Sequence, residues 1–454
     1  MPIAIKDNFC TRDLPTTCGS NMLNGFYSPY DATVVSLLKE AGAKIVGKTN
    51  MDEFGMGSAN VFSSSGPVKN PWGYQNDKSI LEDEQKIRVA GGSSGGSAVA
   101  VAMDMCAVAL GSDTGGSVRL PASYCGIFGF KPSNGQISRN GLVAYANSLD
   151  TVGMLGQNVD NIQSIYDVIA QYDDKDPTSI PLTLRKKISE QENELLMNWS
   201  NDDLTGLKIG IPKEYYVEPL SSEVLESWRS GIQYLKKRGA TIVPISLPHT
   251  KFALPAYYII ALAEASSNLA RFDGVRYGHR STNLSDHNMI YADTRAEGFG
   301  KEVQRRILLG THVLTAGTYE KHFLPAQQAR RLILEDFNNS FIVNNPLYKT
   351  PSISQSEKVH LILTPSAIST APKLIDSLPN CTAAKDHDHD HHNSHRVVDA
   401  YVNDVMTVPA SLSGLPAISI PFSQSKSDGY PIGLQLIGPY GFDRFLLRIA
   451  NKMK

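Results

Sequence analysis

Two glycine-serine clusters, separated by a short apolar stretch, constrain this chain more than any other feature. The first, GGSSGGS, covers residues 91–97, and the second, GSDTGGSVRLP, covers residues 111–121. Glycine reaches backbone conformations that other residues rarely adopt, and it lets a bound group approach the main chain closely. Glycines in simple turns usually occur singly or in pairs, so two dense clusters indicate a specialised site.

Phosphate binding and nucleophilic catalysis are the two kinds of chemistry that use such clusters. Neither cluster contains the lysine of a G-x-x-x-x-G-K-[ST] loop, and neither contains G-x-G-x-x-G. A serine nucleophile needs a base, and it needs N–H groups that stabilise an oxyanion. The N–H groups of Thr114, Gly115, Gly116 and Ser117 could converge in this way. Because no histidine lies in either cluster, a lysine is the favoured base.

The composition is that of an ordinary globular protein of 454 residues, of which 41% are hydrophobic and 19% charged. The formal net charge of −2 argues against a generally basic nucleic-acid-binding surface. Five cysteines without regular spacing favour a reduced, intracellular protein without a disulfide framework. The most apolar run, residues 98–110, is short and contains Asp104, so we expect no membrane insertion.

Strand-like runs alternate with amphipathic helical stretches, which predicts an α/β protein with a parallel or mixed sheet. Strands are predicted at residues 2–6, 44–47, 207–211, 241–245, 361–364 and 417–420, and helices at residues 31–41, 222–237 and 327–337. Three polar segments are predicted to be loops or insertions, at residues 75–86, 172–203 and 385–395. The second of these is a charged linker between a front region (1–171) and a back region (204–454).

The segment 385–395 reads KDHDHDHHNSH and could bind zinc or nickel. Biased polar tracts rarely form packed metal sites with supporting hydrogen bonds. We therefore expect a solvated loop at this position, and no catalytic metal.

The two clusters and the opening PIAIKDN together resemble the amidase signature family. Further stretches, among them NMDEFGMGS, EASSNLARFDGVRYG, AEGFGKEVQRRILLGT and YVNDVMTVPASLSGLPAISIP, extend the resemblance along nearly the whole chain. They point to one branch of that family, the A subunits of tRNA-dependent amidotransferases. The resemblance implies an amidase-signature fold in a single domain over residues 1–454, with a mixed central sheet flanked by helices on both faces.

The resemblance also implies a Ser–Ser–Lys catalytic triad. Ser117 would be the nucleophile, Ser93 the relay that follows a cis peptide bond, and Lys6 the base. Burial would favour the neutral amine of Lys6, which can accept a proton. The turn from Thr114 through Gly115 and Gly116 would supply the oxyanion hole.

Tyr257, Arg306 and Asp404 match the residues that bind free glutamine in this branch of the family. A hydroxyl, a cation and an anion suit a free amino acid, although each residue alone could be an ordinary core or surface residue. The implied reaction is hydrolysis of glutamine through a glutamyl ester of Ser117. The ammonia would pass to a B subunit, which converts Glu-tRNA(Gln) to Gln-tRNA(Gln).

The implied partners are the B subunit, a small third subunit, and Glu-tRNA(Gln), bound mainly through the B subunit. No cofactor is expected in this chain, because ATP and Mg²⁺ are used by the B subunit. Bacterial relatives carry a helical segment before the PIAIKDN strand that helps to bind the third subunit. We therefore expect an N-terminally shortened form with an atypical third subunit, located in the mitochondrial matrix or, alternatively, in a bacterial cytoplasm.

Two other functions remain open at this point. A free-standing amidase of another small amide would act without partners and would tolerate changes at Arg306 and Asp404. A catalytically silent scaffold subunit would show no turnover for Ser117→Ala to abolish.

Overall fold

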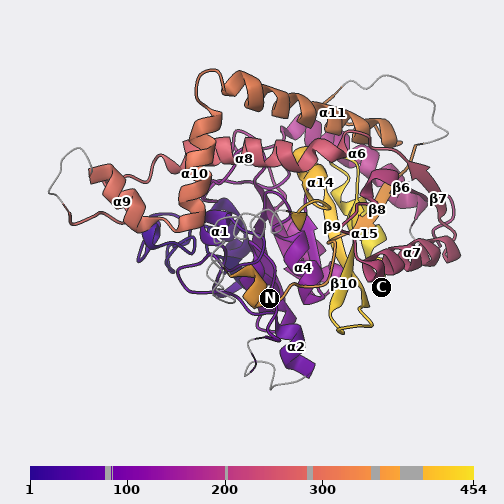
Figure 1. Cartoon of the computed structure of the whole chain (residues 1–454). Helices are drawn as coiled ribbons and strands as arrows, with labels where there is room; N and C mark the ends of the chain where they lie inside the picture. Colours follow the sequence, from indigo (N-terminus) through magenta and orange to yellow (C-terminus); the bar gives the residue numbers. More distant parts are fainter. Residues whose placement is uncertain are drawn as a thin grey trace.

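The computed structural model describes residues 1–76, 83, 85–199, 203–283, 290–348, 358–378 and 402–453. At its centre lies a ten-stranded sheet in the order β2–β1–β3–β5–β4–β9–β10–β8–β6–β7 (Figure 1). The strands are β1 (Pro2–Lys6), β2 (Lys44–Thr49), β3 (Val108–Asp113), β4 (Phe128–Lys131), β5 (Thr151–Gly156), β6 (Lys208–Pro212), β7 (Thr241–Ile245), β8 (Leu361–Pro365), β9 (Ala417–Gln424) and β10 (Pro431–Ile437).

The sheet is mixed. Strand β1 runs parallel to β2 and β3, and β6 runs parallel to β7 and β8. The strands between these two groups pair antiparallel, and the β4–β9 pair joins the front region of the chain to the back region. Strands β3, β4, β5 and β10 are buried along their whole length. Such continuous burial is typical of a sheet that is covered on both faces.

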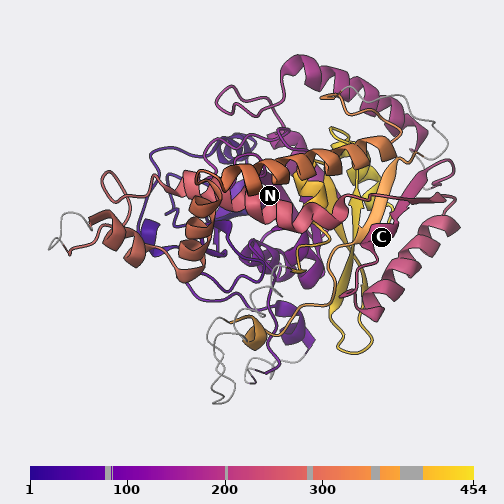
Figure 2. The ribbon, with the colours of Figure 1, turned by 45° about the horizontal axis from the view of Figure 1, so that its top comes forward.

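Helices flank both faces of the sheet, which confirms the predicted fold class (Figures 1 and 2). The helices that pack against strands, or against helices that do so, are α1 (Thr33–Glu40), α3 (Gly95–Ala102), α4 (Arg119–Cys125), α5 (Val159–Ile169), α6 (Leu182–Asn198), α7 (Ser222–Lys237) and α15 (Asp443–Asn451). Among the described residues there are also α2 (Pro71–Asn76), α9 (Ile290–Gly298), α12 (Leu374–Ser377) and α14 (Val408–Leu412).

Three further helices pack against one another beside the sheet. Helix α8 (Ala253–Leu269) contacts both α10 (Lys301–Val313) and α11 (Leu324–Ser340), and Figures 1 and 2 show α8 and α11 side by side. Helix α8 buries Ala256, Tyr257, Ile260 and Ala261 on successive turns. A helix that is apolar on most sides belongs in the interior of a protein. Helix α8 is therefore the central member of this group.

All the strands and helices predicted from the sequence are present, but the segment 172–203 is not a simple loop. It contains α6, a helix of 17 residues that packs against α15. Only Ile188 and Glu192 of α6 are buried, so its apolar stripe is too narrow to stand out from its charged residues. The segment 385–395 and most of the segment 75–86 lie outside the described residues.

Candidate active site

Parallel pairing brings the predicted base next to the second glycine-serine cluster. Ile5 of β1 pairs with Leu110 of β3, so Lys6 and Ser112 lie at adjacent carboxyl ends of these strands. Beyond β3 the chain turns through residues 114–118 into α4, while the first cluster leads into α3, which packs on β3. In α/β proteins, binding sites form at the carboxyl ends of parallel strands.

Lys6 is fully buried and is surrounded by serine hydroxyl groups. Its Nζ atom lies 2.8 Å from Ser93 Oγ, 2.8 Å from Ser94 Oγ and 2.9 Å from Ser112 Oγ. Burial lowers the pKa of Lys6 to about 7, although nearby carboxylates oppose that shift. At neutral pH a substantial fraction of the amine is therefore unprotonated and can accept a proton.

The predicted relay and nucleophile both lie at this site. The Gly92–Ser93 peptide bond is cis, as the family resemblance implied. The main-chain carbonyl of Ser117 accepts a hydrogen bond of 3.1 Å from the N–H of Ser94, which holds the two clusters together. Among the described residues, no hydrogen bond joins Ser117 Oγ to Ser93 Oγ. The transfer of a proton from Ser117 to Ser93 stays a prediction.

The turn that carries Ser117 can present its N–H groups to a ligand. In the described part of the chain, the N–H groups of Gly115, Gly116 and Ser117 donate no hydrogen bond to another residue. A Cβ atom on Gly115 would lie 2.7 Å from Cζ of Tyr257, so no larger residue fits without a shift. Thr114 Oγ1 donates to Asp150 Oδ1 at 2.8 Å, which anchors the start of the turn. This geometry suits an oxyanion hole.

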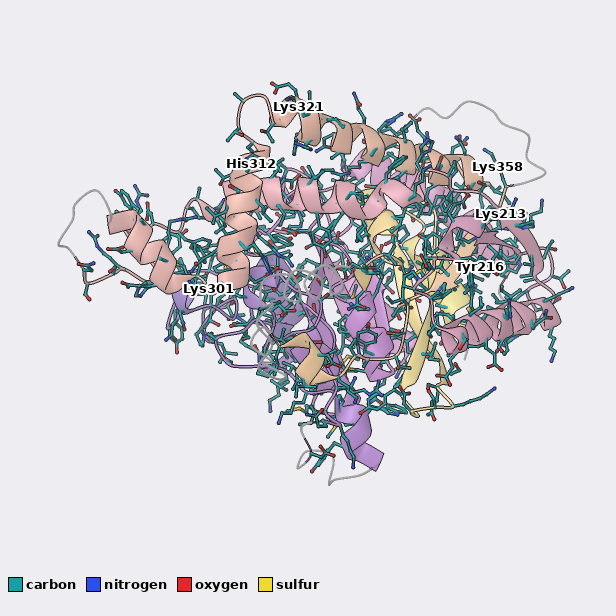
Figure 3. All side chains as sticks on the ribbon, viewed as in Figure 1. Lys213, Tyr216, Lys301, His312, Lys321 and Lys358 are labelled. Carbon is teal, nitrogen blue, oxygen red and sulfur yellow. The ribbon has the colours of Figure 1, made fainter. Side chains whose placement is uncertain are left out.

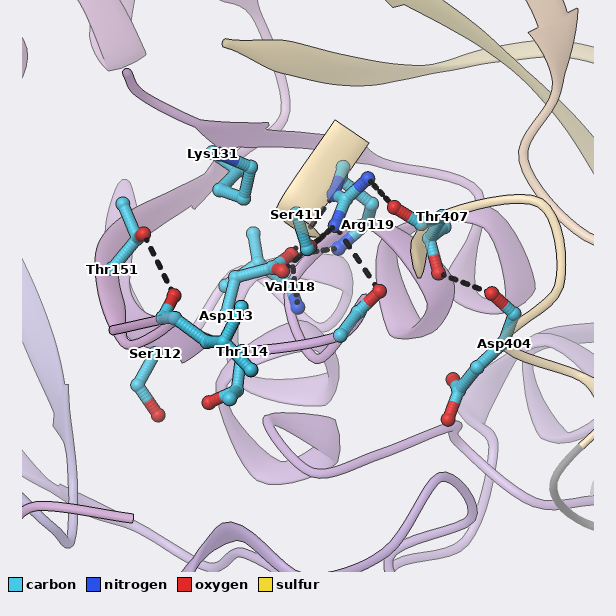
Figure 4. Close-up of polar contacts among 12 residues, drawn as sticks. Ser112, Asp113, Thr114, Val118, Arg119, Lys131, Thr151, Asp404, Thr407 and Ser411 are labelled. Carbon is cyan, nitrogen blue, oxygen red and sulfur yellow. Dashed lines mark hydrogen bonds and ion pairs between the residues drawn. The ribbon is translucent and has the colours of Figure 1, made fainter. Parts of the chain in front are cut away.

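A buried arginine holds the other side of the turn (Figure 4). Arg119 forms a salt bridge of 2.8 Å with Asp113, and both side chains are fully buried. Its guanidinium also donates to the carbonyl of Thr407 at 2.8 Å, Oε1 of Gln435 at 2.7 Å and Oγ of Ser411 at 2.7 Å. A planar guanidinium with five N–H donors can serve several acceptors at once. Arg119 therefore ties the turn that carries Ser117 to the segment that begins α14.

The predicted substrate-binding residues come from the helices that surround this turn. Tyr257 lies on α8, with its ring beside Gly115. Arg306 lies on α10 and is buried. Figure 3 labels Lys301 and His312 near the two ends of this helix, and both of these residues are exposed. Asp404 precedes α14, and its main-chain carbonyl accepts a hydrogen bond from the N–H of Thr407 at 3.1 Å.

Tyrosines link the two charged members of this set. The hydroxyl of Tyr258 donates to Asp404 Oδ2 at 3.0 Å, and the guanidinium of Arg306 lies 5.8 Å from the centre of the Tyr258 ring. Arg306 also donates to the hydroxyl of Tyr145 at 3.1 Å and to Glu302 Oε1 at 2.7 Å. Burial raises the pKa of Asp404 to about 7. A ligand ammonium opposite Asp404 would favour its carboxylate form.

The described part of the chain contains neither a membrane-spanning helix nor a metal-binding cluster. None of its helices is long and apolar enough to cross a bilayer. Within the same residues, no group of three or more His, Cys, Asp or Glu side chains is arranged to hold a metal ion. The histidine-rich segment 385–395 lies outside this part of the chain.

Comparison with known protein families assigns this chain to a family. The amidase family model matches residues 1–447. The chain belongs to the amidase family. The mitochondrial A subunit of glutamyl-tRNA(Gln) amidotransferase from Coccidioides posadasii is 46% identical over 465 residues, which cover all of this chain and 88% of that protein. The corresponding A subunit from Coxiella burnetii is 45% identical over 452 residues, which cover all of this chain and 82% of that protein.

A solved structure supports the same assignment. The A subunit of glutamyl-tRNA(Gln) amidotransferase from Thermotoga maritima, known from a crystal structure, is 36% identical to this chain. The match has a TM-score of 0.73 and covers all of this chain and 85% of that one. Within the amidase family, the predicted resemblance to amidotransferase A subunits is therefore confirmed.

Several residues of this amidase site were not identified from the sequence. They are Asp113, Arg119, Tyr145, Asp150 and Glu302, which hold Arg306 and the turn that carries Ser117. The motif GSDTGGSVRLP displays Asp113 and Arg119, but nothing in it shows that they pair. The predicted residues do lie in one connected region, because Gly115 contacts Tyr257 and Gly116 lies beside Thr407, which bonds to Asp404.

Proposed function

We propose that this chain is the glutamine-hydrolysing subunit of a tRNA-dependent amidotransferase. The observation that carries the proposal is the contact of 2.8 Å between Nζ of Lys6 and Oγ of Ser93, in a buried site beside the turn of Ser117. A buried amine with a pKa of about 7 is suited to general base catalysis near neutral pH. The amidase family and the similarity to amidotransferase A subunits support the same reaction.

In the proposed reaction, Ser117 Oγ attacks the side-chain amide carbon of glutamine. Its proton passes through Ser93 to Lys6, and the N–H groups of Gly115, Gly116 and Ser117 stabilise the oxyanion. The proton then returns from Lys6 to the leaving nitrogen, so that ammonia departs and a glutamyl ester of Ser117 remains. Water attacks this ester with Lys6 again as the base, which releases glutamate and restores Ser117.

The substrate would be held by charges of both signs. Arg306 suits the α-carboxylate of glutamine, because a guanidinium binds carboxylates with good geometry. Asp404 suits the α-ammonium, and Tyr257 lies beside the turn where the amide would sit. A free-standing amidase of a neutral amide would have little use for this buried pair of opposite charges.

The wider role follows from the named relatives. We propose that ammonia passes to a B subunit, which uses ATP and Mg²⁺ to convert Glu-tRNA(Gln) to Gln-tRNA(Gln). A small third subunit of an atypical kind would complete the assembly, and most tRNA contacts would belong to the partners. This chain would need no cofactor of its own. The mitochondrial matrix is the proposed location, because the relative from Coccidioides posadasii is a mitochondrial protein by name.

The test is glutamate release from glutamine by the complex isolated through this chain. Wild type and Ser117→Ala are compared side by side, with recovery of the complex as the control for folding. Loss of glutamate release in an intact Ser117→Ala complex would support the glutaminase and its nucleophile. Equal release from both proteins would exclude Ser117 as the nucleophile. No release from either protein, in a complete complex supplied with tRNA, would favour a different amide or a scaffold.

A further inference from the structure

Lys6 has more hydrogen-bond acceptors around it than a neutral amine can use. Its Nζ atom lies within 3.3 Å of the carbonyl of Ser112 as well as of the hydroxyls of Ser93, Ser94 and Ser112. A neutral amine has two N–H groups and one lone pair. Which neighbour faces the lone pair decides which hydroxyl can give its proton to Lys6.

Ser94 is excluded as a proton donor by its own hydrogen bond. Its hydroxyl donates to the main-chain carbonyl of Ser112 at 3.2 Å, and the side chain is fully buried. With its only hydrogen used in this way, Ser94 Oγ can act toward Lys6 only as an acceptor. One N–H of Lys6 is thereby directed at Ser94.

Ser112 is held in a similar way by Asn8. The amide Nδ2 of Asn8, which can only donate, lies 2.9 Å from Ser112 Oγ. Figure 4 shows the Ser112 side chain pointing away from Arg119, as expected for a residue next to Asp113 on one strand. Asn8 is itself buried, and its main-chain carbonyl accepts a hydrogen bond from the N–H of Val143 at 2.9 Å. The Asn8 amide thus occupies one lone pair of Ser112 Oγ, and the other lone pair is within reach of the second N–H of Lys6, at an Nζ–Oγ distance of 2.9 Å.

We propose that Asn8 and Ser112 are positioning residues, which together with Ser94 hold both N–H groups of Lys6 and direct its lone pair at Ser93. Ser93 then is the hydroxyl that can transfer a proton to the base, although two other hydroxyls lie equally close. This inference rests on the proposed roles of Lys6 and Ser93. It assigns to the side chains of Asn8 and Ser112 a function in the reaction.

The pH dependence distinguishes positioning from a general loss of structure. Electrostatic interactions with Asp52, Asp113, Asp150 and Cys18 favour the charged form of Lys6. Ser112→Ala leaves these groups in place but removes one acceptor that the protonated amine uses. In the plot of kcat against pH, the acidic limb should therefore move to lower pH, while the maximal kcat falls. A site that merely loosened and admitted water would move this limb to higher pH, because burial is what lowers the pKa of Lys6.

The experiment uses the complex isolated through the full chain, with Ser112→Ala, Asn8→Ala and the conservative Ser112→Thr. Ser419→Ala is the matched control, because it removes a buried strand hydroxyl that bonds to Ser366 Oγ at 2.8 Å, away from Lys6. Two readouts are taken against pH, glutamate release and the covalent labelling of Ser117 by a sulfonyl fluoride. We expect kcat to fall about tenfold in Ser112→Ala and Asn8→Ala, with KM for glutamine unchanged. Ser112→Thr should restore kcat, and Ser419→Ala should behave as wild type.

An unchanged kcat and an unmoved acidic limb in both alanine variants would overturn the proposal. So would a loss that Ser112→Thr does not restore, or a limb that moves to higher pH. If Ser117 of the wild type is labelled but glutamine is not hydrolysed, the proposed glutaminase function is refuted and the proposal on Lys6 is not. The labelling rate against pH would then still test the positioning of Lys6, since it does not depend on glutamine.

Discussion

Two buried groups of the site, Lys6 and Asp404, have pKa values of about 7, and both must be deprotonated for the proposed reaction. Burial lowers the pKa of Lys6, so the neutral amine becomes scarce as the pH falls below 7. Burial raises the pKa of Asp404, so the carboxylate that would bind the substrate ammonium is lost over the same range. Each protonation reduces the active fraction about tenfold per pH unit, so kcat/KM should fall about 100-fold per unit well below pH 7.

The bound complex should behave differently. An ammonium group opposite Asp404 favours the carboxylate and moves its pKa below the range of the experiment. Lys6 then is the group that titrates, and kcat should fall only about tenfold per pH unit. When plotted against pH on the acidic side, log kcat/KM should therefore reach a limiting slope of two, and log kcat should reach a limiting slope of one.

The assay is the initial rate of glutamate release by the intact complex, measured from about pH 5 to about pH 9 at constant ionic strength. Asp404→Asn is the matched variant, because it removes one titrating group and keeps a side chain of the same size. Its kcat/KM should have a lower plateau and a slope of one. A kcat that stays constant below pH 7 would show that Lys6 is not the base. A slope of one in the wild-type kcat/KM would show that Asp404 does not titrate as its burial requires.

Three further predictions concern the groups that hold the site. Gly115→Ala would place a Cβ atom 2.7 Å from the Tyr257 ring. The turn would be displaced, so kcat/KM in the glutamate assay should fall about 100-fold. Full activity in a normally assembled complex would contradict the tight fit. Tyr145→Phe removes the hydroxyl that Arg306 contacts at 3.1 Å, so KM for glutamine should rise about tenfold at unchanged kcat. A fall in kcat alone would instead show that Tyr145 takes part in the chemistry. Arg119→Met leaves the Asp113 carboxylate buried without its cation, which should lower the free energy of unfolding in denaturant by about 3–5 kcal/mol. Arg119→Lys should lose less, and equal stability of wild type and Arg119→Met would refute the account of this ion pair.

The elements that were predicted correctly carry strong local patterns. Helix α7 has a regular apolar face, and the runs at β7 and β8 are rich in β-branched or apolar residues. Strands β4 and β5, with the sequences FGFK and TVGMLG, were not predicted, because glycine weakens the strand signal. Helix α6 was not predicted either, because its many charged residues resemble those of a linker.

The proposed catalytic residues were predicted from motifs, whereas the residues that support them were not. Glycine-serine clusters and the PIAIKDN strand single out Ser93, Ser117 and Lys6 through the family resemblance. Asp150 and Tyr145 belong to ordinary stretches of sequence, and their value lies in contacts with Thr114 and Arg306. No local pattern reports such contacts, because each partner lies far away in the chain.

The sequence by itself determined the family, the local order of strands and helices, and which residues have the right chemistry. These properties depend on residue types and short spacings, which folding does not alter. Only the tertiary structure decided that Lys6 is fully buried and that its amine contacts Ser93, a residue 87 positions away in the chain. The protonation of Lys6 and the direction of its lone pair depend on desolvation and on hydrogen bonds from distant segments. Those forces exist only after the chain has packed.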